Sequence, residues 1–425
     1  MDAIQVEGGY PVSGTVSVEG AKNSALKLMA ATILAPGKTT LTNVPNIADV
    51  HVMGKVLKEL GATVEVADEH TLLIDTSQVD SWETPYSLVT QMRASTAVLG
   101  PLLARFGKAI VAMPGGCNIG ARSIDMHILG LEALGVTFDV DHGDIHASAP
   151  HGLVGATVNL EFASVGATEN LIMASVHAKG VTTIDNAARE PEIQDLANML
   201  NEMGADIRGA GSPVIEIHGV SELHPVTHAV TGDRIEAGTF VAIGALVGEP
   251  ITICGFDPDH LGLVLRKYEQ MGIAIERGDR SVTVHRDGAI RAVDIQTLPF
   301  PGFPTDMQAQ TMCLLAMAQG TSIVTENVFE NRFMFASELQ RMGSDIVIQG
   351  HHAVVRGVRR LSGAQVRSPD LRGGAALVMA GLVADGTTTV LDIYHIDRGY
   401  ERFVEKLSAL GARVERVSLP DISYM

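Results

Sequence analysis

The residue with the clearest chemical potential lies in a glycine-rich loop, MPGGCNIGARSIDMH at positions 113–127. Cys117 stands between a Gly-Gly pair and Asn-Ile-Gly, five residues before Arg122, where a helix is expected to begin. A nearby cation and a helix N-terminus both activate a thiol. Cys117 is therefore predicted to be functional, whereas Cys254 and Cys313 lie in apolar segments and are expected to be inert core residues.

Basic residues stand repeatedly where helices are expected to start: Lys22, Arg93, Arg122, Arg332, Arg372 and Arg398. The helix dipole favours Asp or Glu at such positions, so several cations there indicate an anionic ligand. The alternative is that each Arg is a solvated surface residue and that Ser24, Ser95 and Asp370 are simply N-caps. Repetition of the pattern favours a shared anion site for phosphate and carboxylate groups, with Asp306 as its candidate base.

Internal repeats then show how the chain positions these residues. Two series of glycines keep step six times, each recurring about every 70 residues. One series follows amphipathic helical segments and the other follows segments that are apolar nearly all round, so helices of the second kind must be buried. We expect the glycines to end these helices in the left-handed conformation. They are Gly61, Gly135, Gly204, Gly272, Gly343 and Gly411, preceded by Gly37, Gly107, Gly180, Gly248, Gly320 and Gly386.

Short β-branched runs follow both series, so each repeat is predicted to be a β-α-β-α-β-β unit of an α/β protein. Six units in 425 residues suit two domains of three units each, built around buried helices. The polar, turn-rich segment at 224–238 marks the predicted boundary. We therefore expect one domain at 22–230, carrying the Cys117 loop as a lid, and a second at 1–21 plus 231–425.

Composition limits the class of protein. The net charge of −18 argues against nucleic acid as a partner, since that binding needs clustered Lys and Arg. We see no signal peptide, no membrane span, no disulfide framework and no metal-ligand spacing, and the glycine motifs fit neither a phosphate-binding loop nor a dinucleotide fingerprint. The sequence predicts a cytoplasmic protein acting on small anionic substrates.

The chain resembles the UDP-N-acetylglucosamine enolpyruvyl transferases, a branch of the EPSP synthase family, along its whole length. The motifs that carry the resemblance are GAKNSALK, MRAS, PGGCNIGARSIDMH, EFASVGATEN, AAREPEI, GDRIEAGTF, FPTDMQAQ, ENVFENRF, DLRGGAAL and DRGYERF. The cysteine loop is the most specific of them, because the related shikimate-pathway enzymes lack it.

The resemblance implies an inside-out α/β barrel of two domains that close over an active site in the cleft between them. It implies transfer of the enolpyruvyl group of phosphoenolpyruvate to the 3-hydroxyl of UDP-N-acetylglucosamine, with release of phosphate and no metal or organic cofactor. This is the first committed step of peptidoglycan synthesis. In this family the cysteine can form an adduct with phosphoenolpyruvate, and fosfomycin traps it.

Residue roles follow from the same resemblance. Lys22, Arg122 and Arg398 would hold the phosphate of phosphoenolpyruvate, Arg332 and Arg372 its carboxylate, and Asn23 would lie beside the reacting centre. Cys117 would donate a proton and Asp306 would accept the one from the 3-hydroxyl. Contacts to the UDP-sugar would come from Arg93, Arg122, Ser123, Ile124, Asp125, Met126, Ser164, Val165, Asp306 and Val328.

Two alternatives stay open. The first is transfer to 3-phosphoshikimate, against which the Cys117 loop speaks. The second is a catalytically silent nucleotide-sugar sensor on the same fold, against which the intact Cys117, Asp306 and basic residues speak. The sequence makes no prediction of oligomeric state.

Overall fold

The computed structural model describes residues 2–84, 88, 93–112 and 124–420, with the side chains of residues 93–95 not described. These residues form two compact units. Unit I takes the described residues of 20–112 and 124–231, and unit II takes 2–19 and 232–420. Each unit has a separate hydrophobic core. Among the described residues, no helix has the length and apolarity needed to cross a membrane.

Unit I contains three four-stranded sheets. Their strands, in spatial order, are β14 (Thr227–Ala229), β3 (Lys38–Thr42), β5 (Thr71–Asp75) and β4 (Thr63–Asp68); β6 (Glu83–Thr84), β7 (Lys108–Ala112), β9 (Asp144–Ser148) and β8 (Thr137–Asp141); and β10 (Thr157–Asn159), β11 (Val181–Asp185), β13 (Val214–His218) and β12 (Asp206–Arg208).

The helices of unit I are of the two kinds that the sequence predicts. The core helices are α1 (Lys22–Ala31) with the 3-10 turn η1 (Thr32–Leu34), η2 (Arg93–Val98) with α4 (Leu99–Phe106), and α6 (Val165–Ser175). The amphipathic helices are α2 (Ala48–Glu59), α5 (Asp125–Ala133) and α7 (Pro191–Glu202).

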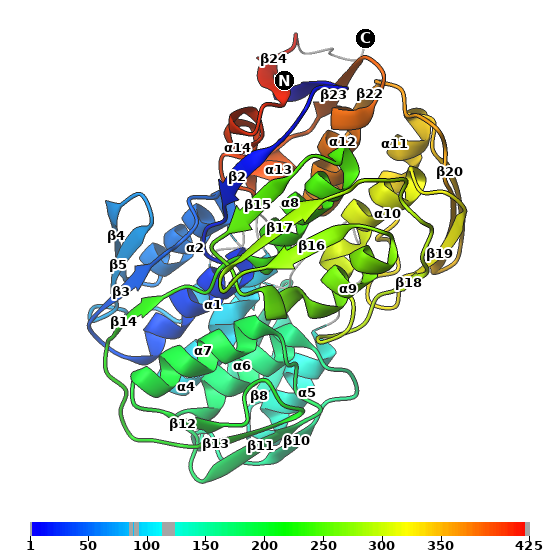
Figure 1. The fold of residues 1–425 in the computed structure, drawn as a ribbon. Helices are drawn as coiled ribbons and strands as arrows, with labels where there is room; N and C mark the ends of the chain where they lie inside the picture. Colours follow the sequence, from blue (N-terminus) through cyan, green and yellow to red (C-terminus); the bar gives the residue numbers. More distant parts are fainter. Residues whose placement is uncertain (1, 85–87, 89–92, 113–123, 421–425) are drawn as a thin grey trace. The chain divides into compact units, whose positions relative to one another are not determined.

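Unit II repeats this architecture around α8 (Arg234–Val247), α10 (Gln308–Ala316) and α12 (Leu371–Val383), which contact one another inside the unit (Figure 1). The outer helices are η3 (Pro258–Leu261) with α9 (Gly262–Gln270), α11 (Phe335–Arg341), α13 (Tyr394–Asp397) and α14 (Phe403–Ala409), and η4 (Thr305–Met307) precedes α10. In α8 every residue except the last, Val247, is buried, as expected of a helix that is apolar nearly all round beyond its first turn.

The sheets of unit II show how the N-terminal residues are used. Their spatial orders are β22 (Gln365–Arg367), β23 (Thr387–Leu391), β1 (Asp2–Glu7) and β24 (Arg413–Ser418); β2 (Gly14–Ser17), β15 (Ile251–Cys254), β17 (Ser281–His285) and β16 (Ala274–Arg277); and β18 (Ile295–Gln296), β19 (Thr321–Thr325), β21 (His352–Arg356) and β20 (Asp345–Gln349). Thus β1 and β2 complete sheets whose other strands all come from beyond residue 231.

All six sheets have the same pattern, with one parallel pair followed by two antiparallel pairs. The twelve glycines of the two sequence series all have positive φ, between 66° at Gly107 and 129° at Gly37. The six glycines of the Gly61 series directly follow the C-caps of their helices, and Gly107 and Gly248 are themselves C-caps, so these predicted helix ends are confirmed. For Gly37, Gly180, Gly320 and Gly386 the prediction is wrong, because their helices end three to five residues earlier and these glycines lie in the turns that lead to the next strand.

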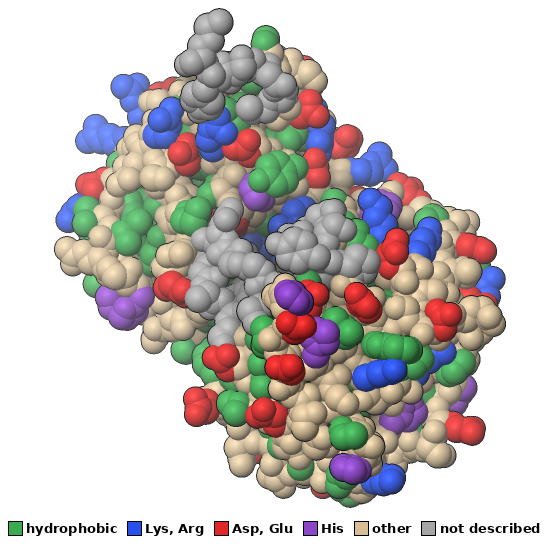
Figure 2. Space-filling model, turned by 180° about the vertical axis from the view of Figure 1, so that it is seen from behind, with side chains coloured by type: hydrophobic (Ala, Val, Ile, Leu, Met, Phe, Trp, Pro, Cys, Tyr) green, Lys and Arg blue, Asp and Glu red, His purple; other side chains and the backbone are tan. Residues whose placement is uncertain are grey.

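The surface carries both signs of charge. On the face shown in Figure 2, Lys and Arg side chains are interspersed with Asp, Glu and uncharged groups. Given the net charge of −18, this visible face offers no continuous basic surface of described residues for a nucleic acid backbone.

Candidate active site

Asp306, Arg332 and Arg372 form a cluster of charges in unit II, as the sequence predicts for residues of one anion site. Arg332 Nη2 lies 2.9 Å from Asp306 Oδ1. Arg372 donates to the other carboxylate oxygen from Nε at 3.2 Å and from Nη2 at 3.1 Å. Both arginine side chains are only 3% exposed, whereas that of Asp306 is 25% exposed. One carboxylate that solvent can reach is thus flanked by two buried cations.

The N-terminus of α12 positions Arg372. Asp370 is the N-cap, and its carboxylate accepts from the backbone N–H groups of Arg372 and Gly373. The glycines that follow permit close packing: a Cβ at Gly373 would lie 2.8 Å from the Cβ of Phe335, and one at Gly374 would lie 2.2 Å from Ser368 Oγ. The Gly-Gly pair therefore sets the first turn of α12 tightly against its neighbours, which fixes where Arg372 emerges.

The electrostatic situation of Arg372 indicates a ligand. A cation near a helix N-terminus opposes the helix dipole, by about 0.3–1 kcal/mol for a surface charge. Its Nη1 is buried and has no hydrogen-bond partner among the described residues. Buried donors are normally satisfied. This guanidinium can therefore accommodate an additional acceptor beyond Asp306.

Glu326, which the sequence analysis missed, organises the loop beside Asp306. Its side chain is buried and accepts from Thr305 Oγ1 at 2.9 Å and from the backbone N–H groups of Val328 and Phe329 at 2.8 and 3.1 Å. Val328 itself is half-buried. An acidic residue directly after a strand, here β19, is the signal that could have identified this position.

Lys22 and Asn23 open α1 in unit I, as predicted. The Nζ of Lys22 lies 2.7 Å from Asp49 Oδ2, and the Asp49 side chain is 3% exposed. Asp49 is in the first turn of α2, where a carboxylate is favoured by the dipole. This partner was also missed, and it fixes the direction of Lys22, while Asn23 is exposed.

From the sequence alone, Ser24 could have been the N-cap of α1. The structure shows that it is not. The cap residue is Ala21, and Ser24 lies inside the helix, where its hydroxyl donates to Asp195. The other Asp195 oxygen is 3.0 Å from His228 Nε2, and His228 Nδ1 is 2.8 Å from Glu202 Oε2. The reason is burial: Ser24 is 1% exposed and packs beneath α7, so its hydroxyl needs a tertiary partner.

Other predicted UDP-sugar residues in unit I lie at helix starts. Ser164 caps α6, its Oγ accepting from Ala167 N at 3.3 Å, and Val165 is the first residue of that helix. Ile124 is the residue before α5, Asp125 begins this helix and is exposed, and Met126 is half-buried. Arg93 begins η2, but its side chain is outside the described part. Cys117, Arg122 and Ser123 also lie outside the described residues.

Two of the expected helix-start positions are wrong. Arg398 is the C-cap of the short helix α13 rather than the start of α14, which begins five residues later at Phe403. Gly399 and the left-handed backbone of Arg402 (φ 48°) separate the two helices. Arg332 lies in a turn three residues before α11. Arg398 is half-buried, and the pKa of His395 is lowered first by burial of the imidazole and second by the charge of Arg398.

The remaining cysteines behave as expected for packing residues. Cys313 is fully buried in α10, and burial raises its pKa to about 12, so the thiol stays protonated. Cys254 is half-buried in β15. Neither has the environment that activates a thiol.

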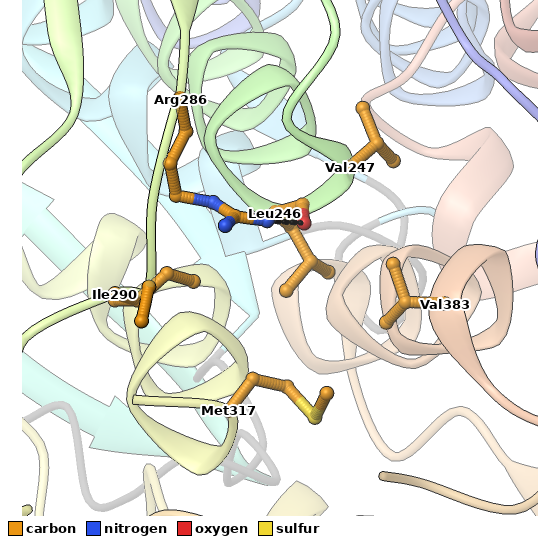
Figure 3. A pocket seen from close by; sticks show the side chains of 7 residues that line it. Leu246, Val247, Arg286, Ile290, Met317 and Val383 are labelled. Atoms are coloured by element: carbon orange, nitrogen blue, oxygen red, sulfur yellow. Dashed lines mark hydrogen bonds between the residues drawn. The ribbon is translucent and has the colours of Figure 1, made fainter. Parts of the chain in front are cut away.

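A pocket of about 310 Å³ lies at the opposite ends of the core helices of unit II (Figure 3). It is lined by Leu246, Val247, Arg286, Ala289, Ile290, Met317 and Val383. The guanidinium of Arg286 donates to the carbonyls of Ala245 at 2.9 Å and Leu246 at 3.1 Å, at the end of α8. None of the candidate site residues lines this pocket.

Comparison with known proteins gives the family. The model of EPSP synthase (3-phosphoshikimate 1-carboxyvinyltransferase) matches residues 6–407. A UDP-N-acetylglucosamine 1-carboxyvinyltransferase of Trichlorobacter lovleyi is 50% identical over 99% of this chain and 100% of its own length. That of Corynebacterium jeikeium is 53% identical over 98% and 99%, respectively.

Solved structures agree in fold. The enolpyruvyl transferase NikO from Streptomyces tendae superposes with a TM-score of 0.89 at 28% identity, covering 99% of both chains. EPSP synthase from Acinetobacter baumannii has a TM-score of 0.76 over 98% of this chain and 100% of its own, and at 18% identity it supports the fold alone. The predicted inside-out α/β fold is confirmed, and the chain belongs to the EPSP synthase family of carboxyvinyltransferases.

Proposed function

We propose that the protein transfers the enolpyruvyl group of phosphoenolpyruvate to the 3-hydroxyl of UDP-N-acetylglucosamine and releases phosphate. The observation that carries this proposal is the Asp306 carboxylate flanked by the buried guanidinium groups of Arg332 and Arg372. This set offers a base for a hydroxyl and cations for a carboxylate. The acceptor is proposed from the relatives named for it, which are about 50% identical along the whole chain.

The proposed roles divide between the two units, which we take as the two domains, with the active site in the cleft between them. Arg332 and Arg372 of unit II hold the carboxylate of phosphoenolpyruvate. Its phosphate is held by Lys22, Arg122 and Arg398, and Asn23 lies beside the reacting centre. The UDP-sugar is held by Arg93, the run 122–126, Ser164, Val165 and Val328.

The reaction is an addition followed by an elimination. Asp306 accepts the proton of the 3-hydroxyl as the sugar oxygen bonds to C2 of phosphoenolpyruvate, and Cys117 gives a proton to the methylene carbon C3. Loss of a proton from C3 and departure of phosphate then restore the double bond, so no oxidant or metal is consumed. The basic residues position the anions and neutralise their charge, which lowers the barrier electrostatically.

The pairing of Asp306 suggests how its basicity is timed. Its carboxylate occupies the same donors, Arg332 Nη2 and Arg372 Nε and Nη2, that a substrate carboxylate would use. A carboxylate arriving at these donors competes with Asp306 and releases it toward the sugar hydroxyl. Binding of phosphoenolpyruvate thereby frees the base.

A phosphate-release assay tests the proposal. Phosphate should appear from phosphoenolpyruvate when UDP-N-acetylglucosamine is added and not when 3-phosphoshikimate is added instead. Release only with 3-phosphoshikimate would support the alternative acceptor, which is the one named in the description of the family model. Binding of the sugar nucleotide without release would support a silent sensor. We place the reaction in the cytoplasm, at the first committed step of peptidoglycan synthesis.

A further inference from the structure

A buried polar cluster lies where the core helices of unit II meet, directly behind Arg372. The Tyr400 hydroxyl is 2.9 Å from Thr239 Oγ1 of α8. Gln310 of α10 donates from Nε2 to Thr239 Oγ1 at 3.0 Å and to the Tyr400 oxygen at 3.3 Å. Thr239 Oγ1 also lies 2.9 Å from the carbonyl oxygen of Ile235.

The direction of each hydrogen bond follows from counting hydrogens. Thr239 has one hydroxyl hydrogen, and the Ile235 carbonyl can only accept it. The Tyr400 hydroxyl must therefore donate to Thr239. Burial raises the pKa of Tyr400, so the phenol keeps the hydrogen that this bond needs. The aromatic ring is thus anchored by its hydroxyl to the backbone of α8 through one threonine.

The ring of Tyr400 also contacts Arg372. The guanidinium carbon lies 5.2 Å from the ring centroid, within the range of a cation–π contact, and both residues are 2% exposed. Asp306 approaches the same guanidinium through Nε and Nη2. When Asp306 leaves these atoms to act as a base, the contact with the Tyr400 ring remains.

We propose that Tyr400 is a positioning residue that holds the Arg372 guanidinium in the orientation needed to bind the carboxylate of phosphoenolpyruvate. This inference rests on the proposed function, since it gives Tyr400 a role only through Arg372. The anchored ring limits the guanidinium to one place, so substrate binding does not have to order it. Loss of the anchor should weaken the use of phosphoenolpyruvate and leave the use of the sugar nucleotide unchanged.

Tyr268 supplies a matched control. It is also fully buried in unit II, its hydroxyl lies 2.9 Å from Thr311 Oγ1, and Thr311 donates to the carbonyl of Met307 at 2.7 Å. Tyr400→Phe and Tyr268→Phe therefore remove the same hydroxyl from the same kind of tyrosine–threonine–carbonyl chain. Only the first chain is attached to an arginine of the proposed site.

The test measures steady-state kinetics and thermal unfolding of both variants. Tyr400→Phe should raise KM for phosphoenolpyruvate about five- to tenfold, with KM for UDP-N-acetylglucosamine within twofold of the wild type. Tyr268→Phe should leave both KM values within twofold of the wild type. It should lower the unfolding temperature by about as much as Tyr400→Phe does. An unchanged KM for phosphoenolpyruvate in Tyr400→Phe, or an equal rise in Tyr268→Phe, would overturn the positioning role.

Further measurements cover the remaining outcomes. If Tyr400→Phe does not fold, Thr239→Val removes the acceptor of the Tyr400 hydroxyl and should give the same selective rise. If the wild type shows no turnover, the proposed function fails, and calorimetric titration with phosphoenolpyruvate decides the inference separately. Weaker binding in Tyr400→Phe than in the wild type then supports it, whereas equal binding, or no binding by either protein, overturns it.

Discussion

The two ends of the core helices in unit II place arginines in opposite electrostatic settings. At one end Arg372 stands in the first turn of α12, where the dipole opposes a cation, and it is paired with Asp306. At the other end Arg286 donates to the last carbonyls of α8, where the dipole favours a cation. The position of Arg286 is accounted for by stability alone, since it donates to carbonyls at the C-terminal end of a helix. We propose that Arg372, which is placed against the dipole, serves a ligand, and that this difference distinguishes the proposed site from the scaffold.

Replacing the acid of the cluster should give the largest effect. Asp306→Asn keeps a hydrogen-bond acceptor near Arg332 and Arg372 but removes the base, so kcat should fall by about 10²–10⁴. Because Asp306 competes with the substrate carboxylate, KM for phosphoenolpyruvate should not rise. Steady-state kinetics with both substrates check this, and a kcat within tenfold of the wild type would show that another group takes the proton.

Removing the opposed arginine should come next. Arg372→Ala leaves the substrate carboxylate without a charge-assisted contact, worth about 2–5 kcal/mol in a desolvated site. We expect kcat/KM for phosphoenolpyruvate to fall by one and a half to four orders of magnitude, roughly the same energy expressed as a rate ratio. The control is Arg286→Ala, for which kcat/KM for phosphoenolpyruvate should stay within threefold of the wild type. Equal losses in the two variants would remove the distinction between the helix ends.

The same control variant should reveal the structural role of Arg286, whose charge the helix dipole favours. Arg286→Ala leaves the carbonyls of Ala245 and Leu246 without its guanidinium at the end of α8. Since the residue is half-buried, we expect the free energy of unfolding to fall by only about 1–2 kcal/mol. Urea unfolding measures this, and an unchanged midpoint would mean that solvent replaces these bonds at no cost.

The comparison extends to His228 in unit I, whose two ring nitrogens are both hydrogen-bonded to carboxylates of the protein. Burial opposes the charge of His228, but hydrogen bonds to Asp195 and Glu202 outweigh burial and raise its pKa above 6.5. The folded protein therefore binds this proton more tightly than the unfolded chain. The resulting stability is fully present below pH 6.5 and is lost as pH rises through the raised folded value.

His228→Gln should remove this part of the pH dependence, an effect of the order of 1 kcal/mol or less. Urea unfolding at about pH 6 and about pH 8.5 should show that the wild type loses more stability than the variant between the two values. The control is His218→Gln, which alters a half-buried histidine–glutamate pair in the same unit that is more exposed than His228. A wild-type difference no larger than that of His228→Gln would contradict the assignment, and kcat should be unaffected.

Local pattern was sufficient for much of this molecule. The glycines predicted helix ends correctly at Gly61 and the five others of its series, because a left-handed residue is a local requirement that glycine meets. Asp370 could also be identified as an N-cap from the sequence, because its side chain bonds to backbone N–H groups only two and three residues away. The helix starts at Arg332 and Arg398 were wrong, because turn residues and a short extra helix there interrupt the simple repeat.

The sequence by itself determined the repeat, the two kinds of helix and the residue types of the candidate site, because each depends on periodicity or on chemistry within a few residues. Only the tertiary structure decided which acid pairs with which cation: Asp306 with Arg332 and Arg372, and Asp49 with Lys22. It also placed the Tyr400 ring in contact with Arg372 and the Glu326 carboxylate in hydrogen bonds with the loop next to Asp306. These partners come from different repeats or separate helices, and buried groups find them by three-dimensional packing, which sequence spacing does not encode.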